Sequence, residues 1–298
     1  MTSPSNPVEE AAEARLLAVD DASLRMVDLA LAEDIGPGDW SSRWTVPPRA
    51  RLEGAIVAGG DGVIAGVAVA AAVFRRLSPR VEVEPLRADG DQVHPGAIVA
   101  AIRGPARAIL SGERTALDFL RRLSGMATLA RRYSDALEGT GAVVLGAGNG
   151  TPGWRLLEAA AVRAGGAHAH RLGLHDGVLL RAAHIALAGS IAEAVRRVKD
   201  QNTRGLRIEV EVDGDEGVAE AAAAGADVVL LAHSDPAAVR SAASLLRRVR
   251  QRPGLAVAAD VTPDGARALA EAGAEAILVE ALPQGAPPLP VTLALAER

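Results

Sequence analysis

The sequence predicts an α/β protein in which a small mixed unit precedes a larger unit of parallel strands. Three observations lead to this prediction. Short alternating strands around one helix fill residues 51–105, a long helix follows, and strands then alternate with helices to the end of the chain. Such alternation implies parallel strands with right-handed crossovers, in an open sheet or a barrel. The near-copies AEAAAAGADVVLLAH (219–233) and ALAEAGAEAILVEAL (268–282) favour the barrel.

The elements follow from hydrophobic spacing, taken in chain order. Residues 1–20 are polar and predict a flexible tail, 21–33 have helical spacing, and AEDIGPGDWSS (32–42) reads as a loop. The mixed unit has strands at 52–58, 62–67, 81–87 and 97–104 around a helix at 68–77, and a helix at 106–137 follows with a possible break at Gly125. Later strands are expected at 142–146, 168–172, 177–181, 207–212, 227–231, 255–259 and 276–280, and helices at 154–164, 189–200, 215–223, 235–250 and 263–272.

Composition excludes several classes of function. The 298 residues are 49% apolar, which predicts a folded globular protein. Only 2% are aromatic and the net charge is −5, so neither nucleic acid nor an anionic membrane is expected as a partner. The absence of cysteine excludes thiolate nucleophiles and cysteine-ligated metals. We find no apolar stretch of signal-peptide or membrane-spanning length and expect a cytoplasmic protein.

A glycine-rich stretch at residues 146–153 raises the possibility of a dinucleotide site. Gly148, Gly150 and Gly153 satisfy the pattern G-x-G-x-x-G after an apolar run. In a Rossmann fold this pattern belongs to the first strand and helix, with an acidic residue about 20 positions on. Here the pattern lies in mid-chain, Pro152 interrupts it, and His168 stands near the position of the acid. A dinucleotide site is therefore disfavoured.

Longer motifs around this stretch resemble the quinolinate phosphoribosyltransferase family, which makes nicotinate mononucleotide in NAD synthesis. They are LAEDIGPGDWSS (31–42), GVIAGVAVAAAVFRRL (62–77), DGDQVHPGAIVAAIRGPAR (89–107), GERTALDFLRRLSGMATLARRY (112–133), TPGWRLLEAAAVRAGGAHAHRLGLHDGVLL (151–180) and IEVEVD (208–213). The resemblance covers nearly the whole chain from about residue 22.

The resemblance implies an N-terminal α/β sandwich joined to an incomplete α/β barrel of the type II phosphoribosyltransferase kind. We expect the sandwich over residues 21–117, completed by about 284–298, and the barrel over 118–283. The family joins quinolinate to phosphoribosyl pyrophosphate with Mg²⁺ and releases pyrophosphate and carbon dioxide. It forms dimers in which each active site borrows an arginine from the partner.

The sequence departs from the family where the phosphoribosyl group would bind. The family motif D-T-R-K-T corresponds to Gly146–Gly150 here, so Gly148 and Asn149 replace an arginine and a lysine that meet anionic substrates. Other replacements are Ala169 for Asn, Arg181-Ala182-Ala183 for Lys-Asp-Asn, Ala232-His233 for Asp-Asn, Ala256–Asp260 for Glu-Ala-Ser-Gly-Gly, and Glu280 for Gly.

These replacements oppose the binding of a phosphate. Glycine-rich turns and positive charge normally hold a ribose 5-phosphate, whereas Asp260 and Glu280 add negative charge at such positions. Two unit charges about 4 Å apart at an effective dielectric of about 20 repel by roughly 4 kcal/mol, about a thousandfold in affinity. The acidic residues that would manage Mg²⁺–pyrophosphate are also depleted, so the family's use of Mg²⁺ with phosphoribosyl pyrophosphate is doubtful here.

Other family positions keep their chemistry. Arg114, Arg122, His170, Arg171, His184, Glu209 and Glu211 remain, and Arg181 keeps the charge of a family lysine. Arg114, Arg171 and Arg181 resemble a clamp for the quinolinate carboxylates, which arginine binds bidentately. Each survivor also has a structural interpretation, such as a solvated helix residue for Arg122 or a satisfied core histidine for His170.

New ionisable residues stand at the ends of three predicted strands, namely His233, Asp260 and Glu280. The active site of an α/β barrel lies at the carboxyl ends of its strands. Together with His170 and His184 they are our candidates for acid, base or metal-ligand roles, with Arg114, Arg171, Arg181, Glu209 and Glu211 as substrate-binding residues. The alternative is that solvated polar residues replaced a lost ligand.

We interpret the chain as a diverged homologue that binds a small aromatic or pyridine-type carboxylate, as a homodimer or with a paralogue. A catalytically silent subunit that partners an active paralogue is the alternative. A residual transferase is disfavoured, because two family lysines are absent and the only lysine, Lys199, lies on a polar helix end.

Overall fold

The computed structural model describes residues 19–146, 150–232 and 235–296, which fold into two compact units. The first unit comprises Met1–Arg131, Gly150–Gly166 and Gly285–Arg298, and the second comprises Arg132–Asn149 and Ala167–Gln284. This partition places residues 118–131 and 150–166, which we expected in the barrel, with the first unit.

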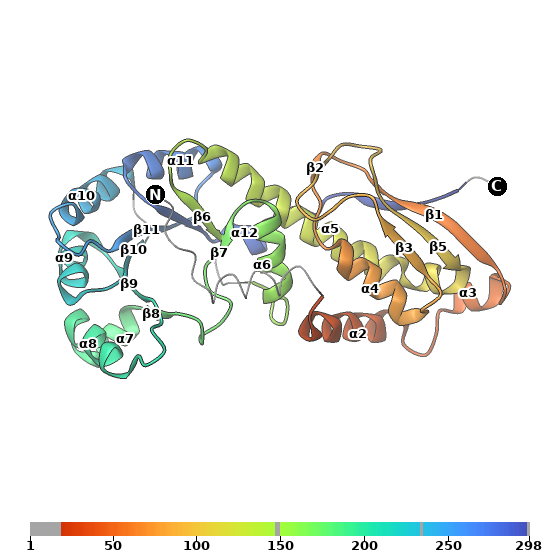
Figure 1. Ribbon diagram of the computed structural model, residues 1–298, viewed down its shortest axis with the longest axis horizontal. Coiled ribbons are helices and arrows are strands. Elements are labelled where there is room, and N and C mark those ends of the chain that lie inside the picture. The colour runs from red at the N-terminus through yellow and green to blue at the C-terminus, as the bar shows by residue number, and fades with distance from the viewer. Residues whose placement is uncertain (1–18, 147–149, 233–234, 297–298) are drawn as a thin grey trace. The chain divides into compact units, whose positions relative to one another are not determined.

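An antiparallel sheet of order β13-β1-β5-β3 forms one layer of the first unit (Figure 1). Its strands are β1 (Arg51–Ala58), β3 (Glu82–Pro85), β5 (Ile98–Pro105) and β13 (Val291–Leu295), and β2 (Gly62–Val63) pairs separately with β4 (Gln92–Val93). The chain's end thus returns to this sheet, where Ala55 lies opposite Ala294.

Helices form the other layer of the first unit. They are α2 (Asp21–Ile35), α3 (Trp40–Thr45), α4 (Val67–Leu77), α6 (Arg155–Ala164) and the first part of α5 (Ala106–Ala136). Phe74, Ile56, Ile102 and Leu120 are fully buried in the core between these helices and the sheet. The sequence predicted a loop where α3 forms, and the Asp39 carboxylate begins this helix by accepting a hydrogen bond from the Ser42 amide.

Helix α5 runs unbroken through Gly125, so the expected break there was wrong. A Cβ atom at this position would lie 2.2 Å from the Pro287 carbonyl oxygen. The absence of a side chain at Gly125 therefore allows the C-terminal segment to pass close to the helix. The helix does not need the unusual backbone angles that glycine also permits.

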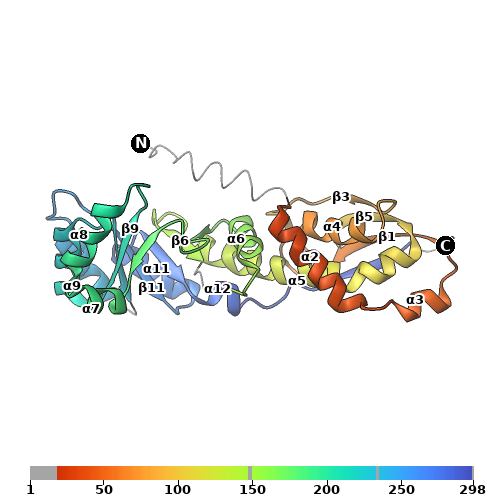
Figure 2. The same cartoon turned by 90° about the horizontal axis from the view of Figure 1, so that it is seen from below.

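The second unit contains a parallel sheet of order β7-β6-β12-β11-β10-β9-β8. The strands are β6 (Val143–Gly146), β7 (His168–Ala169), β8 (Val178–Leu180), β9 (Ile208–Val212), β10 (Val228–Ala232), β11 (Gly254–Ala259) and β12 (Ala276–Val279). Figures 1 and 2 show the sheet curled into an open barrel with helices outside it, which confirms the predicted fold class.

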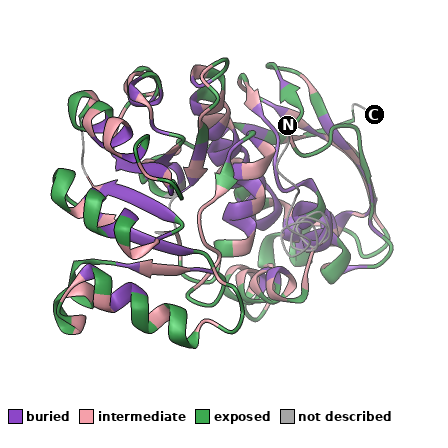
Figure 3. Cartoon of the chain, turned by 60° about the vertical axis from the view of Figure 1, so that its left-hand side comes forward, coloured by how far each residue is buried: buried purple, intermediate pink, exposed green. Residues whose placement is uncertain are grey.

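The outer helices are α7 (Ala182–Ala188), α8 (Ile191–Gln201), α9 (Gly214–Ala224), α10 (Pro236–Leu246), α11 (Pro263–Ala272) and the short α12 (Ala281–Gln284). Their outward faces are exposed while the strands are buried (Figure 3). Val228, Leu230, Ala256, Ala258 and Leu278 pack together, and alternate residues of neighbouring strands share a face. Among the residues described, no helix is long and apolar enough to cross a membrane.

Candidate functional site

The parallel strands of the second unit bring several of the predicted site residues to one edge of the sheet. His170 follows β7, Arg181 follows β8, Asp260 follows β11 and Glu280 follows β12. The carboxyl ends of parallel strands meet at the same edge, so these residues surround the mouth of the open barrel. His233 lies outside the described residues, and so does Gly148 of the glycine pattern.

His170 and Glu209 form a buried polar pair inside this unit. The Nε2 atom of His170 lies 2.5 Å from Oε2 of Glu209, and the two side chains are only 7% and 11% exposed. Glu209 is on β9, where its pairing with Val228 places it on the face that carries the apolar cluster. A buried polar pair of this kind fixes both side chains, because each satisfies the other where water is excluded.

Arg181 is held by Glu211, two residues beyond Glu209 on the same strand. Its Nε donates to Oε2 of Glu211 at 3.1 Å, and the guanidinium side chain remains 65% exposed. Arg171 donates to the Gly177 carbonyl oxygen at 3.3 Å. Both arginines thus keep donors available for a ligand, since a guanidinium has five N–H groups.

His184 has a local structural partner. Its Nδ1 accepts a hydrogen bond of 3.1 Å from the backbone N–H of Arg181, which begins helix α7. The side chain is exposed on the first turn of that helix. This hydrogen bond explains the position of the His184 side chain without a ligand. The acid–base role predicted for His184 stays a prediction.

Asp260 and Glu280 are the first exposed residues after two buried strands. Ala259 pairs with Val279, so the two acidic residues directly follow a paired position on adjacent strands. Burial, and secondly the negative charge of Asp260, raise the pKa of the Tyr133 phenol above its ordinary value. Tyr133 is a residue of this region that the sequence analysis did not single out, although it is the only tyrosine of the chain.

Arg114 and Arg122 belong to the first unit. Arg114 is 74% exposed and its Nη2 donates to the Asp34 carboxylate, which also accepts a hydrogen bond of 2.9 Å from the Thr115 hydroxyl. The hydrogen bond from Arg114, more than that from Thr115, lowers the pKa of Asp34. Arg122 donates to the Thr151 hydroxyl at 3.3 Å. The sequence did not indicate Asp34 as a partner of Arg114, because the two residues lie 80 positions apart.

The structure shows why one glycine of the glycine-rich stretch, Gly150, is needed. The Thr151 amide donates to both carboxylate oxygens of Glu158, at 3.0 and 3.2 Å, and Glu158 is buried. A Cβ atom at Gly150 would lie 1.7 Å from Oε2 of Glu158. Glu158 therefore occupies the space that a side chain at position 150 would take.

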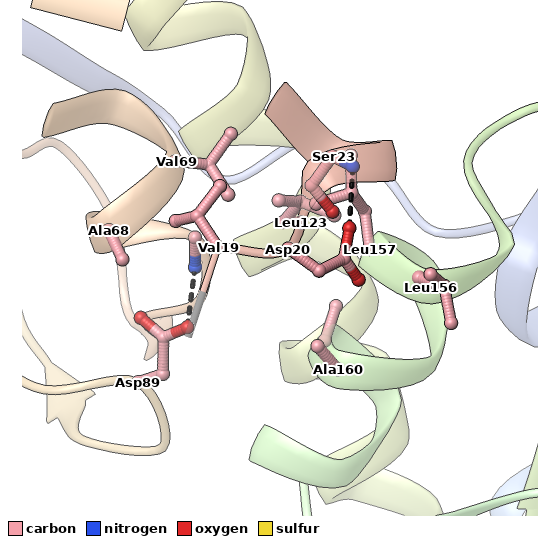
Figure 4. Close-up of a pocket in the computed structure, with 12 residues that line it drawn as sticks. Val19, Asp20, Ser23, Ala68, Val69, Asp89, Leu123, Leu156, Leu157 and Ala160 are labelled. Carbon is pink, nitrogen blue, oxygen red and sulfur yellow. Dashed lines mark hydrogen bonds between the residues drawn. The ribbon is translucent and has the colours of Figure 1, made fainter. Parts of the chain in front are cut away.

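A cavity of about 40 Å³ lies in the first unit, and no predicted site residue lines it (Figure 4). Leu123 and Leu157 form part of its wall, together with the carboxylates of Asp20 and Asp89. Asp20 accepts a hydrogen bond from the Ser23 amide, and Asp89 accepts one from the Gly66 amide. Both carboxylates thus serve as caps of helix N-termini.

Among the described residues, no three His, Cys, Asp or Glu side chains are grouped so that they could hold a metal ion.

Comparisons with known proteins agree with this architecture. Residues 39–124 match the family described as quinolinate phosphoribosyl transferase, N-terminal domain, and residues 126–294 match its C-terminal domain. A probable nicotinate-nucleotide pyrophosphorylase of Bacillus subtilis is 40% identical over 72% of this chain and 73% of its own length. One from Synechocystis is 36% identical over 83% of each chain. The structure of the nicotinate-nucleotide pyrophosphorylase from Francisella tularensis is 29% identical, with a TM-score of 0.88 over 94% of this chain and 99% of that one.

Proposed function

The chain belongs to the quinolinate phosphoribosyltransferase family, and from this premise we propose that it binds a small aromatic or pyridine-type carboxylate without family-type phosphoribosyl transfer. One observation carries the proposal. In the second unit, the residues that keep the family chemistry, on or directly after β7, β8 and β9, lie at one side of the barrel mouth, and the acidic replacements Asp260 and Glu280 lie at the other.

The matching side is formed by β7, β8 and β9. His170, Arg171 and Arg181 follow β7 and β8, and Glu209 and Glu211 on β9 pair with His170 and Arg181. Held guanidinium groups suit a planar carboxylate, because little side-chain entropy is lost when the ligand binds. We assign the carboxylate to Arg171 and Arg181, with His170 fixed beside them by Glu209.

The replaced side is formed by the middle strands β6, β12 and β11. Gly146 ends β6, and Asp260 and Glu280 follow β11 and β12 as exposed carboxylates. Two like charges at neighbouring strand ends repel a phosphate rather than bind it. The described donor set also does not fit a Mg²⁺ ion, because it offers no group of three ligands, and we derive no step through the metal.

Calorimetry of the full chain tests the proposal. Quinolinate is titrated alone, phosphoribosyl pyrophosphate with Mg²⁺ is titrated separately, and nicotinate mononucleotide is assayed in a third sample that contains both substrates and Mg²⁺. The proposal expects binding of the acid, no binding of the pyrophosphate ester and no product. Turnover would establish a residual transferase and overturn the proposed loss of activity.

A matched pair of variants tests where the acid binds. Arg181→Gln is expected to weaken quinolinate binding by about tenfold or more, since hydrogen bonds to charged groups contribute about 1.5–3 kcal/mol. Arg196→Gln is the control, because Arg196 is also exposed and also paired with a glutamate, Glu193, on helix α8. Equal affinities of the two variants would remove Arg181 from the site.

One observation favours the silent subunit as a second candidate. Arg114 is held by Asp34 yet remains 74% exposed, so its guanidinium is fixed and accessible to another chain. Co-expression with an active paralogue, followed by sedimentation, tests this candidate. A heterodimer whose transferase activity falls with Arg114→Ala would support it, and a chain that neither associates nor alters the paralogue's activity would refute it.

A further inference from the structure

The turn between β11 and α11 is short and held at two successive residues. Strand β11 ends at Ala259 and helix α11 begins at Pro263. The Thr262 hydroxyl accepts a hydrogen bond of 3.2 Å from the Gly265 amide, which caps the helix. The Val261 carbonyl accepts a hydrogen bond of 2.5 Å from the Tyr133 hydroxyl. Asp260, immediately before these residues, is exposed.

Tyr133 reaches this turn from helix α5 and is only 4% exposed. A buried hydroxyl needs a hydrogen-bond partner, and the bond to Val261 joins two segments 128 residues apart in the sequence. Phenylalanine would fill the same space without this bond. The hydroxyl therefore has a role that packing alone does not explain.

The fixed turn matters because Asp260 has a neighbour of like charge. Ala259 and Val279 are paired, and Asp260 and Glu280 follow them on strands that lie about 4.8 Å apart. Two carboxylates at such neighbouring positions repel each other. Hydrogen bonds at Val261 and Thr262 fix the backbone of the turn, so the turn resists the displacement of Asp260 that this repulsion favours.

We propose that Tyr133 is a positioning residue, whose hydroxyl holds the Val261 carbonyl and thereby keeps the Asp260 carboxylate beside Glu280 at the barrel mouth. This inference rests on the proposed function, in which these two carboxylates oppose a phosphate. Tyr133 acts through the backbone of the turn, by its hydrogen bond to the Val261 carbonyl.

Amide hydrogen exchange of the full chain tests the proposal. Tyr133→Phe is expected to speed exchange at residues 260–266 by about fivefold, the effect of one lost hydrogen bond. Ser134→Ala is the matched control, because the neighbouring Ser134 hydroxyl is buried and has no hydrogen-bond partner among the described residues. Unchanged exchange in the turn of Tyr133→Phe overturns the proposal.

A spectroscopic measurement keeps the test valid even if Tyr133→Phe does not fold. Tyr133 is the only tyrosine, so the alkaline absorbance titration reports on this hydroxyl alone. Asp260→Asn is expected to lower the titration midpoint, because the carboxylate beside the phenol disfavours its ionisation. An identical midpoint in Asp260→Asn overturns the placement of Asp260.

Quinolinate calorimetry separates this inference from the proposed function. A protein that binds no quinolinate but gives both expected results would overturn the proposed function and retain the role of Tyr133. A protein that binds quinolinate but gives neither result would overturn the role of Tyr133 alone.

Discussion

His170 Nε2 lies 2.5 Å from Glu209 Oε2, although four strands separate β7 from β9 in the order of the sheet. In a flat sheet, five strand spacings of about 4.8 Å would place these strands roughly 24 Å apart. The pair therefore joins two distant strands across the interior of the curled sheet. It also places a histidine and two carboxylate-bearing positions of β9 at the same side of the barrel mouth.

Removing this pair is expected to destabilise the second unit. Glu209→Ala should lower the free energy of unfolding by about 2 kcal/mol or more, because the buried imidazole loses its partner. Glu211→Ala is the matched control on the same strand. It removes a pair to the largely exposed Arg181 and should cost about 1 kcal/mol or less. Urea denaturation of both variants measures the difference, and equal losses would contradict a special role for the buried pair.

A side chain at position 150 is expected to conflict with Glu158. Gly150→Ala should destabilise the protein by about 1–3 kcal/mol, since its Cβ atom would overlap the Glu158 carboxylate. The combination Gly150→Ala with Glu158→Ala should be less destabilised than the sum of the single changes. A double-mutant cycle of thermal unfolding measures this coupling. Simple additivity would mean that the two residues do not compete for space.

Removing the two carboxylates at the ends of β11 and β12 is expected to improve phosphate binding. Asp260→Asn with Glu280→Gln should bind inorganic phosphate on the order of tenfold more tightly at low salt, because the repulsion is removed. Asp200→Asn with Glu271→Gln removes the same charge from other exposed sites and serves as the control. Calorimetry with inorganic phosphate gives both affinities. The expectation fails if the two double variants bind alike.

Acid is expected to weaken the contact between Arg114 and Asp34. The pKa of Asp34 is lowered in the folded protein, chiefly by the hydrogen bond from Arg114. Its contribution to stability is therefore fully present above the unfolded value of about 3.9 and is lost as the pH falls through the lower folded value. Arg114→Ala should be less stable than the wild type at pH 7, and the difference should shrink below about pH 4. Urea denaturation at several pH values follows it, and a difference independent of pH would exclude this contact as the cause.

Local patterns predicted most of the fold, because strands and amphipathic helices are encoded by the spacing of neighbouring residues. Helix α11 was expected at 263–272 and is observed at Pro263–Ala272. Helix α7 was missed, since AAHIALA (182–188) is short and its cap comes from the side chain of His184. Strand β13 was not predicted because VTLAL (291–295) becomes a strand by pairing with β1, more than 230 positions earlier in the sequence.

For the site, the sequence placed charged residues at the ends of parallel strands, because that placement depends only on where each strand stops. The contacts of those residues could not be read in the same way. Arg181 with Glu211, Arg114 with Asp34 and Tyr133 with Val261 each join positions at least 30 residues apart. Nothing in the local sequence distinguishes these partners from other charged or polar residues.

By itself, the sequence determined the α/β class and the family motifs. These are properties of residue type and spacing along the chain. Only the tertiary structure decided that His170 faces Glu209, that Glu158 fills the space beside Gly150, and that the Tyr133 hydroxyl donates a hydrogen bond to the Val261 carbonyl. The physical reason is that each of these contacts depends on how far the sheet curls and on how closely distant segments approach, and both are set by packing of the whole unit.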